Sequence, residues 1–202
     1  MKDAAQRPPN PLRSGLSVVE GVTALERKDS NMANRYCFDF GRVRETKKKY
    51  YIAYGSNLNV QQMRLRCPFA AALGTAELEG WELLFKGSKT GSYLTIEECD
   101  GGSVPAVVWE VTESDEKALD RYEGFPSFYY KKELRVQYKG IRTGRRRTVT
   151  AFVYIMHEDR PIGIPSDCYM RTCLEGYDTF FFDKRILAAA YDKCVEVCRN
   201  EE

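Results

Sequence analysis

The chain contains 202 residues, of which 43% are hydrophobic and 30% are charged, and its formal net charge is +2. This composition is typical of a soluble globular protein with one domain or two small ones, and the charge favours no class of charged partner. No apolar run is long enough to cross a membrane, and no apolar segment follows Lys2 as a secretory signal would require. We therefore expect a cytoplasmic protein that has no membrane partner.

Cysteine and histidine usage limits the chemistry that the chain can carry out. The seven cysteines form no close pair with the spacing of metal ligands, and His157 is the only histidine. A metal site is therefore not expected, and buried reduced thiols are the simplest account of the cysteines. A serine or cysteine hydrolase with a histidine base is disfavoured, because the lone histidine lies in a polar loop. If the chain is an enzyme, its base is a carboxylate.

The first residues of the chain differ from the rest in composition. Residues 1–34 are rich in proline and in polar side chains, which is typical of disordered segments. We interpret them as a disordered region or an extension, in which case Met32 is a hypothetical native start. Residues 35–200 are predicted to form a single domain that begins with a short strand or an ordered edge at 36–40.

The stretch Tyr-Ile-Ala-Tyr-Gly-Ser-Asn-Leu at residues 51–58 predicts a strand that turns at a glycine and leads into a helix. Gly55 removes the Cβ where the backbone must turn sharply or approach a ligand. Ser56, Asn57 and Asn59 are all favourable at a helix N-terminus. Backbone N–H groups at such a junction can bind a carboxylate or an oxyanion. The alternative is an ordinary strand–turn–helix without a ligand.

The remaining pattern combines short strands with a few helices. Alternating apolar residues and glycine-containing turns predict the strands, and capping residues predict the helix ends. The expected strands are 74–79, 81–86, 93–96, 104–111, 128–138 and 148–156, with a turn at 100–102. The expected helices are 59–66, ended by Pro68; 112–123, ended by Gly124; one from Ser166 to Leu174, closed by Gly176; and one from Asp178 or Thr179 to Arg199.

Glu123 occupies the last turn of the helix expected at 112–123. The exposed carbonyl groups at a helix C-terminus carry partial negative charge, which disfavours a carboxylate and raises its pKa. Aromatic neighbours such as Tyr122 and Phe125 would add desolvation. A pKa of about 6 would make Glu123 a usable general base or acid at neutral pH. The alternative is a surface glutamate in a capping turn.

Tyr169 lies in the stretch Pro-Ser-Asp-Cys-Tyr at residues 165–169, which predicts the first turn of a helix. From this position its phenol can point into a pocket. The alternative is a tyrosine that only packs against the core.

Arg142 and the three arginines at 145–147 lie at the tip of the hairpin expected at 128–156. A basic hairpin tip is usually solvated, and no aromatic side chains for stacking lie beside it. We therefore expect no nucleic-acid partner.

Three stretches of the chain resemble, in order and spacing, the motifs of the gamma-glutamyl cyclotransferase-like superfamily. They are Tyr-x-Ala-Tyr-Gly-Ser-Asn-Leu at 51–58, Leu-Asp-x-x-Glu-Gly at 119–124 with a tyrosine following at 129 or 130, and Pro-Ser-x-x-Tyr at 165–169. The resemblance covers roughly residues 50–192. The N-terminal residues and the basic hairpin tip have no counterpart in it.

The resemblance implies a compact α+β fold, in which a small mixed sheet curls towards a barrel with flanking helices. It implies an enzyme that releases 5-oxoproline from a small-molecule gamma-glutamyl substrate. Glu123 would move the proton and Tyr129 would line the pocket with Tyr169. The loop that binds the glutamyl group would consist of Tyr51, Ala53, Tyr54, Gly55, Ser56, Asn57 and Leu58. Because ring closure is intramolecular, the reaction needs no enzyme nucleophile, no metal and no cofactor, which agrees with the single histidine.

Two alternatives stay open at this point. The first is a cyclotransferase for gamma-glutamylamines, such as an isopeptide or a biosynthetic intermediate, whose leaving amine would be selected by Phe125, Phe128 and the loop 160–165. Glutathione is less favoured as a substrate, because no basic clamp lies near the motifs. The second alternative is a non-catalytic domain that binds a small molecule or another protein on the same fold.

Overall fold

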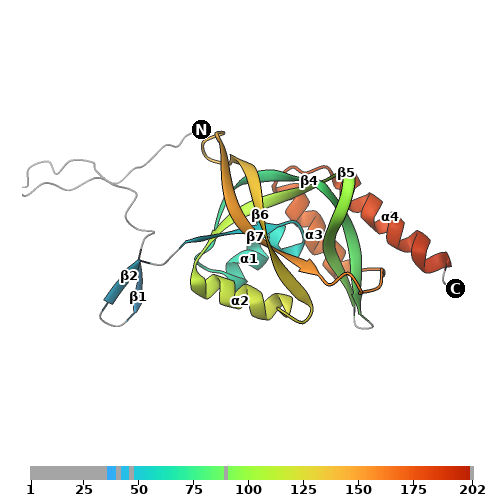
Figure 1. Cartoon of the computed structure of the whole chain (residues 1–202), viewed down its shortest axis with the longest axis horizontal. Helices are drawn as coiled ribbons and strands as arrows, with labels where there is room; N and C mark the ends of the chain where they lie inside the picture. The colour runs from blue at the N-terminus through green and yellow to red at the C-terminus, as the bar shows by residue number, and fades with distance from the viewer. Residues whose placement is uncertain (1–35, 40–41, 46–47, 89–90, 201–202) are drawn as a thin grey trace, which may run out of the picture. The chain divides into compact units, whose positions relative to one another are not determined.

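A computed structural model of the chain describes residues 36–39, 42–45, 48–88 and 91–200 (Figure 1). The predicted extension at 1–34 lies outside the described residues. Strands β1 (Tyr36–Asp39) and β2 (Arg42–Glu45) pair antiparallel and form a separate two-stranded sheet. The short strand expected at the start of the domain is therefore present as β1.

Five strands close into a barrel in the order β3-β5-β4-β6-β7 (Figure 1). All neighbouring pairs are antiparallel except the closing pair of β3 with β7, which is parallel. The strands are β3 (Lys49–Ala53), β4 (Ala71–Ser88), β5 (Gly91–Val111), β6 (Tyr129–Gly140) and β7 (Arg146–Met156). The predicted fold class, an α+β protein with a mixed sheet curled towards a barrel, is confirmed.

Side chains fill the barrel and form its core. Ile52 of β3 lies opposite Val108 of β5 and Val153 of β7, and all three residues have no exposed surface. Small barrels are packed in this way rather than hollow. A ligand must therefore bind at an end or a side of this barrel.

Strands β4 and β5 correct the sequence prediction of four short strands. Each is a single long strand, and β4 runs through Gly80 while β5 runs through Gly101. Both glycines adopt a positive φ, of +79° and +78°, and the register of β4 against β5 shifts between Glu79 and Trp81. A bulge of this kind bends a strand without ending it, so the glycines mark bulges rather than turns.

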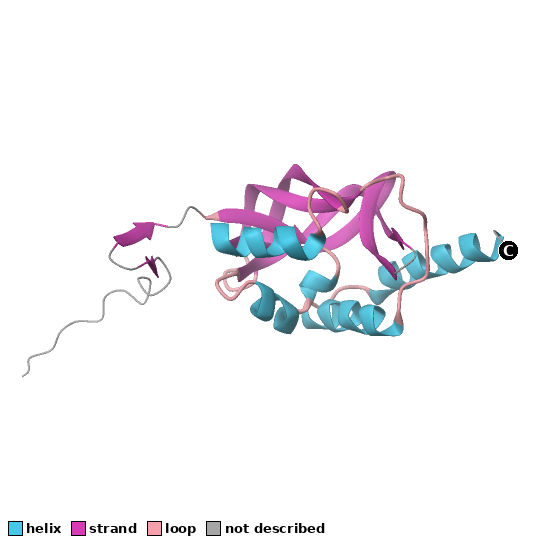
Figure 2. Ribbon diagram, turned by 90° about the horizontal axis from the view of Figure 1, so that it is seen from below, coloured by secondary structure: helices cyan, strands magenta, loops and turns pink. Residues whose placement is uncertain are grey.

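The helices gather mainly on one side of the barrel (Figure 2). They are the 3-10 helix η1 (Ser56–Leu58), α1 (Val60–Arg66), α2 (Glu113–Glu123), α3 (Asp167–Thr179) and α4 (Lys184–Asn200). Among the described residues, no helix combines the length and the apolar character that crossing a membrane would need. The expected cytoplasmic location stays a prediction.

Capping residues fix the ends of the helices that carry the predicted motifs. The Asn59 side chain accepts hydrogen bonds from the N–H groups of Gln61 and Gln62, which starts α1. Thr112 forms a capping box with Asp115 at the start of α2. Gly124, with φ +64°, ends α2 as predicted, so Glu123 is the last residue of the helix.

Helices α3 and α4 differ from the prediction at Gly176. This glycine does not end α3, which continues to Thr179. A Cβ added to Gly176 would lie 2.5 Å from the Cβ of Leu58, so the glycine allows α3 to approach η1 closely. Helix α4 begins at Lys184 rather than near residue 178, and the carboxylate of Asp183 accepts the N–H of Arg185 at 2.9 Å.

Candidate active site

The end of α2 meets the loop after β3 at the side chain of Asn57, which also bonds back to β3. The side-chain N–H group of Asn57 donates to Glu123 Oε1 at 2.8 Å and to the hydroxyl of Tyr51 at 2.9 Å. Asn57 belongs to the 3-10 helix η1, and Glu123 is the last residue of α2, which Gly124 ends. Two motifs that lie 66 residues apart in the sequence are therefore in contact.

A small cavity of about 30 Å³, the inner cavity, lies at this contact. Most of the residues predicted for the site line it, together with Leu94 and Tyr154, which the sequence analysis did not identify. The predicted residues in the wall are Tyr51, Tyr54, Gly55, Ser56, Asn57, Glu123, Tyr129 and Tyr169. Glu123 therefore lines the same cavity as Gly55 and Ser56.

Ala53 and Leu58 do not line the inner cavity. Both are buried, and they belong to the hydrophobic core. Leu58 packs at the closest point between η1 and α3, where Gly176 faces it. Their place in the motif is therefore explained by packing rather than by contact with a ligand.

The environment of Glu123 raises its pKa from 4.5 to about 7. Burial is the largest cause, because it disfavours the charged form of the carboxyl group. The positive charge of Arg66 and the hydrogen bond from Asn57 oppose this effect but do not cancel it. The direction expected from the sequence is confirmed, although burial rather than the helix end is the main cause.

The tyrosine hydroxyls of the inner cavity are neutral hydrogen-bonding groups at physiological pH. Burial raises the pKa of Tyr51, Tyr54, Tyr129 and Tyr169 above the usual value of 10. Tyr54 donates to the carbonyl oxygen of Tyr154 at 2.6 Å, and Tyr129 donates to that of Leu94 at 2.9 Å. The Tyr169 hydroxyl accepts the N–H of Leu94 at 3.1 Å. Because Leu94 is held from both sides, β5 forms one wall of the cavity.

Arg66, from the last turn of α1, supports the site without lining the cavity. Its guanidinium group donates to Asn57 Oδ1 at 2.5 Å and lies 3.6 Å above the centre of the Tyr122 ring. The bond to Oδ1 leaves the amide N–H group of Asn57 directed at Glu123. Arg66 was not predicted as a site residue, because its only signal in the sequence is a basic side chain shortly after the motif at 51–58.

A wider cleft of about 330 Å³, the outer cleft, adjoins the inner cavity. The two spaces share Ser56, Glu123, Tyr129 and Tyr169 in their walls. The residues that line only the outer cleft are Tyr93, Arg121, Tyr122, Gly124 and Phe128. Glu123 therefore faces a small polar space on one side and a larger aromatic space on the other.

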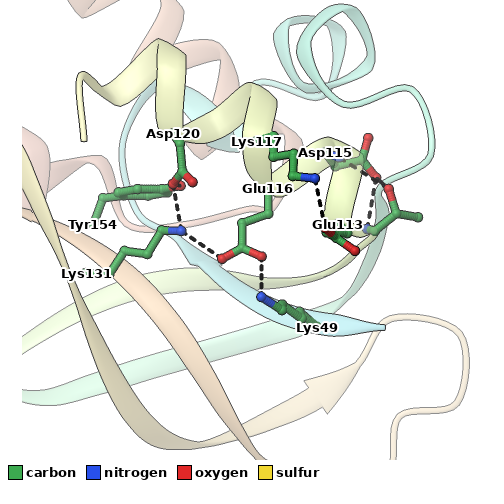
Figure 3. A network of polar contacts seen from close by, with 9 residues as sticks. Lys49, Glu113, Asp115, Glu116, Lys117, Asp120, Lys131 and Tyr154 are labelled. Carbon is green, nitrogen blue, oxygen red and sulfur yellow. Dashed lines mark hydrogen bonds and ion pairs between the residues drawn. The ribbon is translucent and has the colours of Figure 1, made fainter. Parts of the chain in front are cut away.

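Two other carboxylates on α2, Glu116 and Asp120, form ion pairs with lysines (Figure 3). Lys131 contacts Glu116 Oε1 at 2.7 Å and Asp120 Oδ1 at 2.6 Å, and Lys49 contacts Glu116 Oε2 at 2.5 Å. The hydroxyl of Tyr154 also donates to Asp120 at 2.6 Å. These contacts hold α2 against β3, β6 and β7, whereas Glu123 makes no ion pair of this kind with a lysine among the described residues.

Among the described residues, no cysteine and no histidine lines the inner cavity or the outer cleft. Burial raises the pKa of Cys67 and of Cys173 to about 12, so both thiols are protonated at neutral pH and unreactive. His157 Nε2 lies 2.8 Å from the carbonyl oxygen of Pro126 and is absent from the walls of both spaces. Within the described residues, no group of three acidic, histidine or cysteine side chains could hold a metal ion.

A carboxyl group with a pKa of about 7 that lines a cavity among neutral phenols can exchange protons with a bound small molecule, and such groups gather at the sites of enzymes. Comparisons with known proteins narrow this class. The family described as gamma-glutamyl cyclotransferase, AIG2-like, matches residues 51–171 of the chain. The chain belongs to this family, so the family and the enzyme class predicted from the three motifs are confirmed.

Named relatives agree with the family. A gamma-glutamylcyclotransferase from Homo sapiens is 33% identical over 153 residues, which cover 72% of this chain and 78% of the human protein. A gamma-glutamylcyclotransferase from Bos taurus is 38% identical over 106 residues, which cover 49% of this chain and 56% of the bovine protein. A solved structure of a gamma-glutamyl cyclotransferase matches with a TM-score of 0.59 and 29% identity, over 66% of this chain and 80% of that chain.

Proposed function

We propose that the protein is a gamma-glutamyl cyclotransferase that converts a gamma-glutamyl amino acid or amine to 5-oxoproline and the free amine. The observation that carries the proposal is the position of Glu123, with a pKa of about 7, between the inner cavity and the outer cleft. The loop at 51–58 binds the glutamyl group in the inner cavity, and the leaving amine extends into the outer cleft.

Glu123 acts first as a general base and then as a general acid. The α-amine of the glutamyl group attacks its own γ-carbonyl carbon, so a new C–N bond forms and the bond to the leaving nitrogen breaks. Glu123 takes the proton that the attacking amine loses and delivers a proton to the leaving nitrogen. A peptide-like α-amine has a pKa of about 8, close to the value of about 7 for Glu123, so proton transfer costs little in either direction.

Tyr51, whose hydroxyl is held in place by the Asn57 amide, stabilises the oxygen of the tetrahedral intermediate. Among the described hydrogen bonds, the Tyr51 hydroxyl only accepts, from Asn57, and therefore keeps its own proton for a substrate oxygen. The hydroxyls of Tyr54 and Tyr129 already donate to backbone carbonyl groups and serve to shape the cavity. A preorganised donor at a developing oxyanion typically contributes a factor of about 10²–10³ to the rate.

Orientation supplies the remaining acceleration, because the reacting groups belong to one molecule. The inner cavity of about 30 Å³ has room for about one water molecule, so the glutamyl group occupies it together with the adjoining part of the outer cleft. A folded glutamyl chain at this junction brings the α-amine near its own γ-carbonyl carbon. No nucleophile from the protein is required. This agrees with the raised pKa of Cys67 and Cys173 and with the position of His157 outside the site.

A substrate panel tests the proposal. The purified protein is incubated with gamma-glutamyl amino acids, gamma-glutamylamines and glutathione, and 5-oxoproline and free amine are quantified. We expect the two products in equal amounts from at least one class of substrate. Faster turnover of simple gamma-glutamylamines than of gamma-glutamyl amino acids would favour the alternative function, a gamma-glutamylamine cyclotransferase. Binding of these compounds with no product from any of them would overturn the proposal in favour of a binding domain.

A further inference from the structure

The outer cleft has the size and the composition of a site for a second chemical group. Its volume of about 330 Å³ lies at the lower end of the range of about 300–1,000 Å³ for ligand sites, whereas the inner cavity is far smaller. Because the two spaces meet at Glu123, a gamma-glutamyl compound whose reacting carbonyl group lies beside Glu123 and whose head points towards the inner cavity directs its leaving group into the outer cleft. The walls of the outer cleft therefore select the amine.

Aromatic rings form the apolar part of these walls. The ring of Tyr93 packs edge-on against the ring of Tyr169, at 5.1 Å and 86°, and against that of Phe128, at 6.2 Å and 79°. Tyr93 is still 36% exposed and Tyr122 is 46% exposed, so both present ring surface that a ligand can cover. Arg66 covers one face of the Tyr122 ring and holds it in place. These neighbours keep the rings ordered before a ligand binds, which favours a flat or bulky apolar group.

Arg121 supplies a positive charge at the same cleft. Its side chain is exposed and lines the outer cleft, and among the described residues it forms no ion pair with an acidic side chain. A nearby carboxylate on the ligand would give Arg121 a partner with favourable geometry. The other charged group in the wall is Glu123, which takes part in the reaction.

We propose that the outer cleft binds the leaving amine as an α-amino acid with a large apolar or aromatic side chain, whose side chain covers Tyr93, Tyr122 and Phe128 and whose carboxylate pairs with Arg121. This inference rests on the proposed function and names the substrate class of the same site. Amines without a carboxylate use only the rings. Small amino acids such as glycine use only Arg121.

Three substrates separate the two parts of the cleft. Gamma-glutamyl-phenylalanine carries both the ring and the carboxylate, gamma-glutamyl-glycine only the carboxylate, and gamma-glutamyl-phenethylamine only the ring. We expect kcat/KM for the phenylalanine compound to exceed that for the glycine compound about 10-fold, because an apolar group is gained in a hydrophobic pocket. We expect kcat/KM for the phenylalanine compound to exceed that for the phenethylamine compound about 3-fold, which is the size expected for an exposed ion pair.

Matched variants assign each preference to its residues. Tyr93→Ala reduces several-fold the ratio of kcat/KM for the phenylalanine compound to kcat/KM for the glycine compound. Tyr93→Phe keeps the ring and retains this ratio, which shows that the fold tolerates a substitution at this position. Arg121→Gln makes kcat/KM for the phenylalanine compound equal to that for the phenethylamine compound. The control Arg142→Gln changes another exposed arginine, at the hairpin tip, and leaves both ratios unchanged. Ratios that are unaffected by Arg121→Gln and Tyr93→Ala would overturn the inference.

A binding measurement distinguishes this inference from the proposed function. Calorimetric titration of the Glu123→Gln variant with the three compounds should give the same order of affinity, because binding does not require proton transfer. Product formation from all three compounds at equal rates, together with equal affinities, would overturn the inference while the proposed function stands. Ranked affinities without 5-oxoproline from the wild-type protein would overturn the proposed function and support the preference of the cleft.

Discussion

Glu116 and Glu123 lie on the same helix, α2, yet the protein shifts the pKa values of their carboxyl groups in opposite directions. Burial acts to raise the pKa of Glu116, but hydrogen bonds and charges from Lys131 and Lys49 outweigh it, so the pKa is lowered. Burial raises the pKa of Glu123 to about 7, because Arg66 and Asn57 oppose it only in part. One helix therefore carries a permanently charged carboxylate and a carboxyl group that exchanges protons at neutral pH.

Direct contact with a cation accounts for this difference. The ammonium groups of Lys131 and Lys49 touch the two oxygens of Glu116, at 2.7 Å and 2.5 Å (Figure 3). Arg66 is also near Glu123, but its guanidinium group hydrogen-bonds Asn57, so a neutral amide rather than a cation contacts the carboxyl group. An amide stabilises the charged form less than an ammonium group does. If contact with a cation separates the two glutamates, substitutions at each glutamate and at its neighbouring cation should change turnover and stability in different ways.

The largest expected effect is the loss of turnover in Glu123→Gln. Removing a general acid–base group typically lowers the rate by about 10²–10⁴-fold, and glutamine keeps the size and one oxygen of the side chain. The control Glu116→Gln makes the same substitution on the same helix and should change kcat less than about 3-fold. Release of 5-oxoproline at saturating substrate measures both variants. Equal losses in the two variants would show that the helix, rather than the position of Glu123, supports turnover.

The same variant should stabilise the protein at high pH. A folded-state pKa above the unfolded value of 4.5 means that the folded protein holds its proton more tightly, so Glu123 lowers stability as the pH rises from 4.5 through about 7. The full cost above pH 7 is roughly 3 kcal/mol, at about 1.4 kcal/mol for each tenfold change in proton affinity. Urea unfolding measures the change in the free energy of unfolding that Glu123→Gln causes. This change should be more favourable at pH 8 than at pH 4 by roughly 3 kcal/mol. An identical effect at both pH values would contradict the raised pKa.

Loss of Lys131 should destabilise the protein by about 2 kcal/mol at pH 7. Lys131→Met leaves Glu116 and Asp120 partly buried without this cation, and broken pairs of this kind are costly. Because the pKa of Glu116 is lowered, its contribution to stability is present above the unfolded value and is lost as the pH falls through the folded value. The deficit of the variant should shrink in acid. Lys132→Met, which breaks the exposed pair with Glu98, should cost less than about 1 kcal/mol.

Local signals in the sequence predicted much of this site. Capping residues such as Thr112 and Gly124 act through neighbouring backbone, so the end of α2, and with it the position of Glu123, followed from the sequence. The motif at 51–58 predicted the loop for the same reason. Glycine was ambiguous, because a positive φ serves a bulge as well as a turn. Gly80 and Gly101 therefore suggested strand ends where the strands continue.

Long-range packing supplied what the sequence did not indicate. Tyr93 and Leu94 reach the site because β5 crosses the barrel beside the loop at 51–58, and nothing near them in the sequence marks this. Tyr154 was one of many apolar and aromatic residues in a strand. Gly176 was interpreted as a helix end, although its function is to let Leu58 approach. Contacts of this kind depend on the register of the closed barrel, which local patterns do not determine.

The smallest expected effect, a displaced pH profile in Arg66→Gln, tests the origin of the near-neutral pKa of Glu123. The positive charge of Arg66 lowers this pKa, so its removal raises it further. Because Glu123 must be ionised to accept a proton, the rise of kcat/KM with pH should move upward by about half a unit to one unit. Activity at pH 7 falls several-fold and recovers in part at pH 8.5. The attacking amine of the substrate titrates equally in both proteins, so it cannot account for a difference between them.

Arg66→Lys separates the charge of this residue from its geometry. Lysine keeps the positive charge but cannot reproduce the planar contact with the Tyr122 ring or the paired hydrogen bonds to Asn57 and Gln62. If charge alone sets the pKa, the lysine variant follows the wild-type pH profile. If orientation of the Asn57 amide also matters, its kcat falls at every pH without a displaced profile. A wild-type profile in Arg66→Gln would instead show that burial alone sets the pKa of Glu123, and that the two carboxylates of α2 differ only through the lysines around Glu116.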